Sequence, residues 1–131
     1  MSSRAAGYWL AVVLSLQIEP TPAGAHAVLI RSSPASRAVL TQPPTRVVLW
    51  FNERIEPAFT ALTVWSEEGV QVDLRDVVVG PDEPRQLSVS LPPLAPGSYT
   101  VRFRVISVDS HVVESKFSFR IKPAPGVGVR P

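Results

Sequence analysis

The residues best suited to chemistry are two histidines and one aspartate. The histidines are His26 and His111, and Asp109 lies two positions before the second of them. In an extended segment, residues two apart point to the same face, so Asp109 and His111 are expected to be able to approach one ion together. Judged by spacing alone, His111 could equally be an exposed histidine in a turn, and Asp109 could cap that turn through its own backbone.

His26 gains a second metal-binding group if it becomes the first residue of an exported protein. The preceding segment has the order of an export signal: Arg4, a mostly apolar run over residues 5–16, a polar stretch, and the small residues Ala23 to Ala25. The apolar run is shorter than the roughly 20 residues that span a bilayer, and the alternative is a buried N-terminal helix. We predict a signal peptide over residues 1–25 and a periplasmic protein that is soluble after cleavage.

A histidine in first position offers an ion both its α-amine and its imidazole, which together close one chelate ring. The α-amine has an ordinary pKa of about 7.7–8.0, so a metal can displace its proton near neutral pH. Together with His111 and Asp109, His26 would supply three nitrogens and one carboxylate oxygen, a set that suits tetragonal Cu(II). Zn(II) and Ni(II) could use the same ligands, but Cu(II) heads the affinity order for such a site.

The composition excludes several other kinds of site. The sequence has no cysteine, which rules out disulfides, thiolate metal sites and cysteine nucleophiles. Its one methionine is Met1, so no thioether ligand would remain after processing. The formal net charge is +2, with basic and acidic residues interleaved and no cluster of Lys and Arg. We therefore expect no nucleic-acid partner, and we take a monomer as the default state of a small exported carrier.

The elements that must position these residues are predicted to be β-strands. Apolar and polar residues alternate strictly over residues 46–52, 62–65, 87–91, 99–105 and 116–122, which is the pattern of half-buried strands. Turn signals such as Pro92-Pro93 and Pro96-Gly97 separate these runs. Six to eight short strands in about 100 residues indicate two packed antiparallel sheets.

Within this pattern, the segment 107–110 interrupts the alternation between a long strand, 99–106, and a final strand, 111–121. Most aromatic residues fall on the inward parity, namely Phe51, Tyr99, Phe103, Phe117 and Phe119. Trp50 and Trp65 fall on the opposite parity and could be exposed or packed. The Pro/Gly-rich tail, residues 123–131, is predicted to be disordered.

Several motifs resemble those of the CopC family of periplasmic copper-resistance proteins, and the resemblance covers nearly all of residues 26–122. The motifs are His26 after the signal, Ser33-Pro34-Ala35, the strand Val48-Leu49-Trp50-Phe51-Asn52-Glu53, the turn and strand over residues 94–101, and Ser107-Val108-Asp109-Ser110-His111 followed by Phe117-x-Phe119. The resemblance implies an all-β, Greek-key β-sandwich or barrel of about seven strands, cupredoxin-like or immunoglobulin-like.

The resemblance also implies a Cu(II) site built on His26, Asp109 and His111. The family pattern places an acidic residue after the early strand, here Glu53, which would either hold a ligand in place or bind the ion weakly itself. A solvated carboxylate at the strand end is the alternative. Some members carry a methionine-rich loop for Cu(I), which is absent here, so one Cu(II) site and no Cu(I) site are predicted. Many members have glycine where this chain has Ser110, and serine is expected to be tolerated with a negative φ.

Three functions remain open at this point. The preferred one is a non-enzymatic Cu(II) carrier or buffer for copper homeostasis or resistance, with a separate CopD-like inner-membrane copper transporter as a possible partner. The second is an N-terminal-histidine copper monooxygenase acting on polysaccharide, which the extra ligand Asp109 and the lack of an evident aromatic platform disfavour. The third is a metal-free β-sandwich interaction module, because a fold alone does not determine function.

Overall fold

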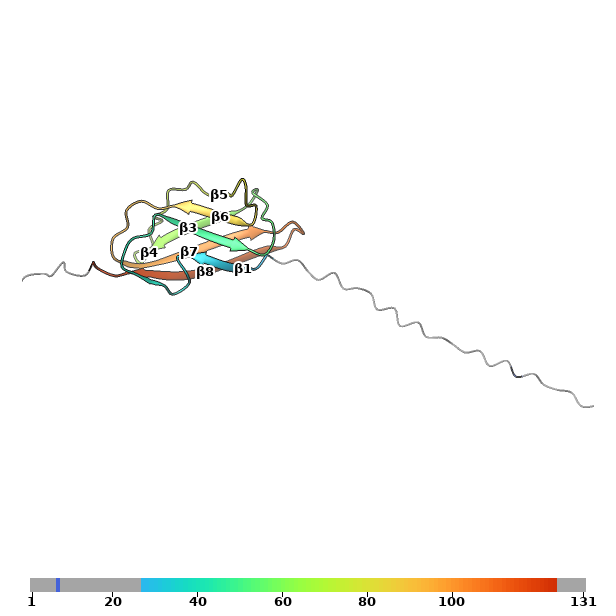
Figure 1. Cartoon of the computed structure of the whole chain (residues 1–131), viewed down its shortest axis with the longest axis horizontal. Helices are drawn as coiled ribbons and strands as arrows, with labels where there is room; N and C mark the ends of the chain where they lie inside the picture. Colours follow the sequence, from blue (N-terminus) through green and yellow to red (C-terminus); the bar gives the residue numbers. More distant parts are fainter. Residues whose placement is uncertain (1–6, 8–26, 125–131) are drawn as a thin grey trace, which may run out of the picture.

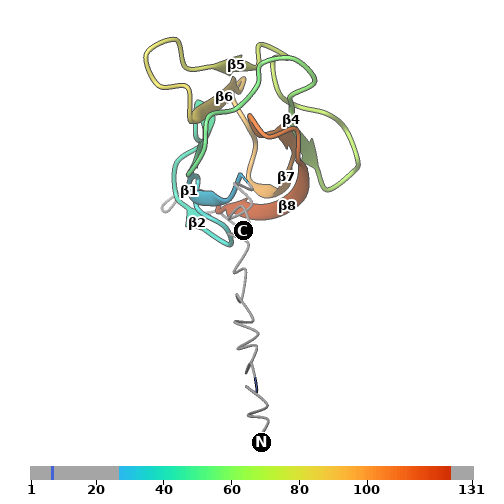
Figure 2. The same cartoon turned by 90° about the vertical axis from the view of Figure 1, so that its right-hand side faces the viewer.

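Two four-stranded β-sheets pack face to face (Figures 1 and 2). The computed structural model describes Gly7 and residues 27–124. The strands of this part are β1 (Leu29–Ser33), β2 (Val39–Leu40), β3 (Arg46–Phe51), β4 (Ala61–Ser66), β5 (Val78–Val79), β6 (Gln86–Ser90), β7 (Gly97–Ile106) and β8 (Val112–Ile121). The predicted all-β sandwich is confirmed. The described part has eight strands where about seven were predicted, and two of the eight, β2 and β5, have only two residues each.

Some of the predicted features lie outside the described residues. These are the signal peptide over residues 1–25, apart from Gly7, together with His26 and residues 125–131 of the tail. Within the described part, no helix is long and hydrophobic enough to cross a membrane.

The chain alternates between the sheets as it runs. One sheet has the order β1-β3-β6-β5 and the other β2-β8-β7-β4. Among the described strands, only β5–β6 and β7–β8 are consecutive within one sheet; every other connection crosses from sheet to sheet, as in Greek-key sandwiches. The β7–β8 hairpin is the longest pairing, from Gly97 opposite Ile121 to Ile106 opposite Val112. It therefore provides a long, continuous support for the turn that follows Ile106.

The core consists of the alternate apolar residues that the pattern assigned to the inner faces. Phe51 of one sheet meets Phe103 of the other edge to face, with ring centroids 5.7 Å apart. Tyr99 and Phe119 stack at 5.5 Å within the second sheet. Phe117 has the same parity but is only partly buried. The other fully buried strand residues include Val47, Leu49, Leu62, Val64, Leu87, Val89, Val101 and Val105. Each such side chain stabilises the fold by about 1.5–3 kcal/mol relative to exposure.

The two tryptophans of opposite parity lie half-buried on the outer faces of the sheets, and an arginine accompanies each of them. The guanidinium carbon of Arg31 lies 3.9 Å from the ring centroid of Trp50, and that of Arg102 lies 5.6 Å from the ring centroid of Trp65. Such cation–π contacts contribute about 0.5–1 kcal/mol at exposed sites.

The entry into β7 is fixed by a tyrosine. The hydroxyl of Tyr99 donates a hydrogen bond to the carbonyl of Ala95 at 2.6 Å, across the turn that contains Gly97. Gly97 has a φ of 152°, which glycine adopts readily and other residues rarely do. β7 consequently begins at Gly97, two residues before the predicted start at Tyr99.

Candidate metal centre

The reversal between β7 and β8 carries the candidate ligands that the structure describes. Between Ile106 and its partner Val112, the reversal is closed by backbone hydrogen bonds from Ser107 N to His111 O at 3.1 Å and from Ser110 N to Ser107 O at 2.9 Å. Ser110 has a φ of 68°, so the expectation of a negative φ there was wrong. So short a reversal uses one left-handed residue, a conformation that is open to glycine but costs other residues about 1–2 kcal/mol.

Asp109 and His111 are in direct contact. Oδ2 of Asp109 lies 2.8 Å from Nδ1 of His111. Its other oxygen, Oδ1, accepts the backbone N–H of His111 at 3.3 Å and the hydroxyl hydrogen of Ser107. The structure thus brings the two candidate ligands together in a turn, not in the extended segment that the sequence argument assumed. The same carboxylate also caps the turn, so the ligand and capping interpretations of Asp109 are compatible.

The environment of Asp109 keeps it ionised. The hydrogen bond from the Ser107 hydroxyl is the largest influence that lowers the pKa of Asp109 to about 2; partial burial opposes it, and His111 reinforces it through hydrogen bonds and charge. Asp109 is therefore an anion throughout the neutral range. Its side chain is 29% exposed and that of His111 is 53% exposed, so an ion from solvent can reach both.

The separation of the two side chains suits a shared ion. Two ligand atoms bound about 2.0 Å from one metal and at right angles to each other lie about 2.8 Å apart, which matches the observed Oδ2–Nδ1 distance of 2.8 Å. The same distance is that of a hydrogen bond by which a carboxylate orients a metal-binding histidine. The turn is therefore arranged to offer either two ligands, from Asp109 and His111, or one ligand with its orienting carboxylate.

Residues 27 and 28, which directly precede β1, are held at the same end of the sandwich. Ala27 is buried, and Val28 is fixed to Asn52 by two hydrogen bonds: its N–H donates to Oδ1 at 2.6 Å, and its carbonyl accepts the Asn52 N–H at 3.1 Å. Three residues further on, Ile55 forms a β-bridge with Ser107. Residues 52–55 span at most about 11 Å. Figure 1 shows the start of β1, the end of β3 and the β7–β8 turn at one end, which faces the viewer in Figure 2.

The other two predicted site residues, His26 and Glu53, are not shown in contact with Asp109 and His111. His26 lies outside the described residues, and Glu53 lies half-buried in the segment that joins Val28 to the turn. Within residues 27–124, no group of three histidines or carboxylates is close enough to hold a metal, so Glu53 does not complete a set with Asp109 and His111. Sequence reasoning did not assign Ser107 a role. A hydroxyl two residues before an aspartate in a turn could have indicated one.

Comparison with protein families gives a clear match. The CopC domain matches residues 29–122, which include all eight described strands and the turn that carries Asp109 and His111. The chain belongs to the CopC domain family. The resemblance seen in the sequence motifs is therefore confirmed, and so is the fold that it implied.

Relatives and solved structures of the CopC family agree with this assignment. The copper transport protein CutJ of Bacillus subtilis is 29% identical over 120 residues; the match covers 91% of this chain but only 22% of CutJ. Copper resistance protein C of Xanthomonas campestris pv. juglandis is 28% identical over 126 residues and is covered over 91% of its length, against 85% of this chain. The crystal structure of CopC from Methylosinus trichosporium OB3b is 34% identical with a TM-score of 0.72, covering 79% of this chain and 100% of that one.

Proposed function

We propose that this protein is a non-enzymatic carrier or buffer of Cu(II) that is exported to the periplasm, binds one ion, and serves copper homeostasis or resistance. The observation that carries the proposal is the contact between Asp109 and His111 at 2.8 Å, in a turn where the buried hydroxyl of Ser107 orients the carboxylate. Membership of the CopC family supports copper as the cargo, since relatives are named for copper transport and copper resistance.

The proposed ligands are the α-amine and imidazole of His26, the imidazole of His111 and the carboxylate of Asp109. The anchoring of Ala27 and Val28 beside the β7–β8 turn supports this set, because Ala27 directly follows His26 in the sequence. Three nitrogens and one oxygen favour Cu(II) over Zn(II) or Ni(II). In this proposal Glu53 either holds a ligand in place or binds the ion weakly itself.

A carrier fits the described surface better than an oxidase of polysaccharide. A flat sugar-binding platform needs several open aromatic faces, whereas Trp50 is covered by Arg31 and Trp65 is accompanied by Arg102. Phe59 is 77% exposed, but it is a single ring in the loop before β4. Four protein ligands would also leave little room for a substrate at the ion. As part of the proposal, the protein acts as a monomer and exchanges copper with a separate CopD-like membrane transporter.

Competition titration against a Cu(II) chelator tests the site assignment. His111→Ala and Asp109→Ala are expected to lower the affinity strongly because each removes a ligand or its orienting partner. Glu68→Ala is the control: it removes an exposed carboxylate in the turn after β4, near the strand end where Ser66 pairs with Tyr99. Glu53→Gln distinguishes a weak ligand, which would lower the affinity, from a solvated carboxylate. Unchanged affinity in both His111→Ala and Asp109→Ala would contradict the proposal.

A further inference from the structure

The outer face of the sheet β2-β8-β7-β4 carries positive charge that the described residues do not balance. The outward positions of β7 and β8 hold Arg102, Arg104, Lys116 and Arg120, against the single acidic side chain Glu114. Arg104 Nε lies 3.1 Å from Oε1 of Glu114 and is neutralised by it. Within residues 27–124, neither Arg102 nor Lys116 forms an ion pair.

The pairing of Arg102 with Lys116 brings two positive charges together, and the contact of Arg102 with the Trp65 ring, at 5.6 Å, does not neutralise either of them. The two residues are direct cross-strand partners in the β7–β8 register. Like charges directly opposite each other destabilise a sheet, whereas opposite charges in the same positions stabilise it. A face that mixes positive and negative side chains would be equally soluble. Solubility alone therefore does not explain why two cations face each other here. The pair is explained if an anion lies between the two side chains.

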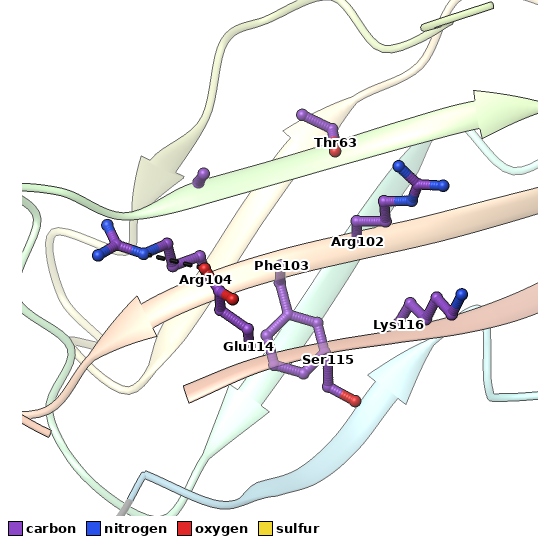
Figure 3. A pocket seen from close by; sticks show the side chains of 8 residues that line it. Thr63, Arg102, Phe103, Arg104, Glu114, Ser115 and Lys116 are labelled. Carbon is purple, nitrogen blue, oxygen red and sulfur yellow. Dashed lines mark ion pairs between the residues drawn. The ribbon is translucent and has the colours of Figure 1, made fainter. Parts of the chain in front are cut away.

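A hollow at this pair offers room for such an anion. It has a volume of about 430 Å³. Charged side chains of β7 and β8 line it together with Phe103, Ser115 and the small side chains Ala61 and Thr63 of β4; the charged ones are Arg102, Arg104, Glu114 and Lys116. In Figure 3, Arg102 extends from β7 toward β4, and Lys116 extends along β8. The long cationic side chains thus flank a recess in which β4 contributes no bulky side chain.

We propose that this hollow and the cationic face around it bind an acidic, extended segment of a partner protein, with its carboxylates at Arg102 and Lys116. In an extended chain, alternate side chains on one face repeat every 6.4–6.8 Å or so. If one carboxylate of such a segment lies at Arg102 and Lys116, the next would therefore reach Arg104, two residues along β7, in place of Glu114. Arginine can also bind a carboxylate through two parallel hydrogen bonds.

The face lies next to the β7–β8 turn. The Arg104–Glu114 pair is two residues from the Ile106–Val112 pair at which the turn begins, a distance of about 7 Å. A segment bound along β7 and β8 would therefore end close to Asp109 and His111. The proposed recognition of an acidic segment does not itself require copper at the turn.

The test uses a labelled peptide of alternating glutamate and serine, with the glutamine–serine peptide as its control, at low salt. The glutamate peptide is expected to shift the backbone NMR signals of residues 102–104 and 114–116, and added salt is expected to weaken binding. The double variant Arg102→Gln/Lys116→Gln is expected to bind roughly three- to tenfold more weakly. The matched variant Arg75→Gln/Arg85→Gln, in the loops before β5 and β6, is expected to bind like the wild type.

Three results would overturn the proposal. The first is peptide-induced shifts spread over the whole surface. The second is equal binding by the Arg102→Gln/Lys116→Gln variant when its thermal unfolding shows that it is folded. The third is cosedimentation with phosphatidylglycerol vesicles that depends on Arg102 and Lys116, in the absence of peptide binding, which would assign the face to anionic lipid instead.

Discussion

The hydroxyl of Ser107 offers a sensitive test of how the candidate site is organised. Ser107 is 0% exposed, and its hydroxyl donates to Oδ1 of Asp109 while Oδ2 contacts His111. The substitution Ser107→Ala removes this one oxygen and leaves both proposed ligands in place. Because residues that hold metal ligands typically contribute a factor of about 10–100 to metal affinity, we expect Ser107→Ala to weaken Cu(II) binding by about that factor.

The size of this loss should come from orientation and not from proton competition. The hydrogen bond from Ser107 is the largest influence that lowers the pKa of Asp109 from 3.8 to about 2, and its removal returns the pKa at most toward the ordinary value. At either value at least about 99.9% of the carboxyl is ionised at pH 7, so protons hardly compete with the metal in either protein. What changes is that the carboxylate of Asp109 can rotate away from His111.

The assay is competition titration with a Cu(II) chelator at pH 7, accompanied by thermal unfolding to confirm the fold. Ser88→Ala is the matched control, since Ser88 is also buried and its hydroxyl accepts a hydrogen bond from Arg46 at 2.7 Å, but it lies within β6. Ser88→Ala is expected to keep the wild-type copper affinity. If folded Ser107→Ala also keeps it, the reasoning about orientation of the carboxylate is refuted.

Three further changes test the fold and its charges. Tyr99→Phe removes the hydrogen bond to Ala95 and is expected to lower the free energy of unfolding in urea by about 1 kcal/mol; no change would show that this bond does not stabilise the start of β7. Lys116→Glu places opposite charges across from Arg102 and is expected to raise that free energy by about 0.2–1 kcal/mol, whereas a decrease would refute the view that the native pair is strained. Because the pKa of Asp109 falls to about 2 in the folded protein, its contribution to stability is complete above its ordinary value of 3.8 and is lost as the pH falls through about 2. Asp109→Asn should therefore be less stable than the wild type at pH 6 and approach it near pH 2, as followed by urea unfolding across pH; a difference that is constant with pH would contradict this assignment.

The fold could be predicted from the sequence because alternation reports directly on burial. Val47, Leu49 and Phe51 follow the rule that one face of a strand packs inward, and all three are essentially fully buried. The strands β2 and β5 could not be found this way, since each has two residues and takes its conformation from its neighbours.

The site was predicted less completely because it depends on the conformation of a turn. Asp109 and His111 were selected by residue type and by resemblance, but their contact comes from a reversal with Ser110 in the left-handed region. Ser110 takes its positive φ in the reversal between β7 and β8. The glycine that many family members have at this position was a signal for that conformation. Ser107 was missed because its hydroxyl acquires a partner only once the turn has formed.

Electron paramagnetic resonance of the Cu(II)-loaded protein, with its N-terminus verified by mass, tests the central claim most directly. The sample that begins at His26 should be compared with one that carries a single added glycine before His26. We predict one tight equivalent of Cu(II) with coupling to three nitrogens in the first sample, and loss of affinity with an altered spectrum in the second, because the added residue removes the chelate of amine and imidazole. Identical spectra and affinities in the two samples would contradict a site that includes the N-terminal histidine.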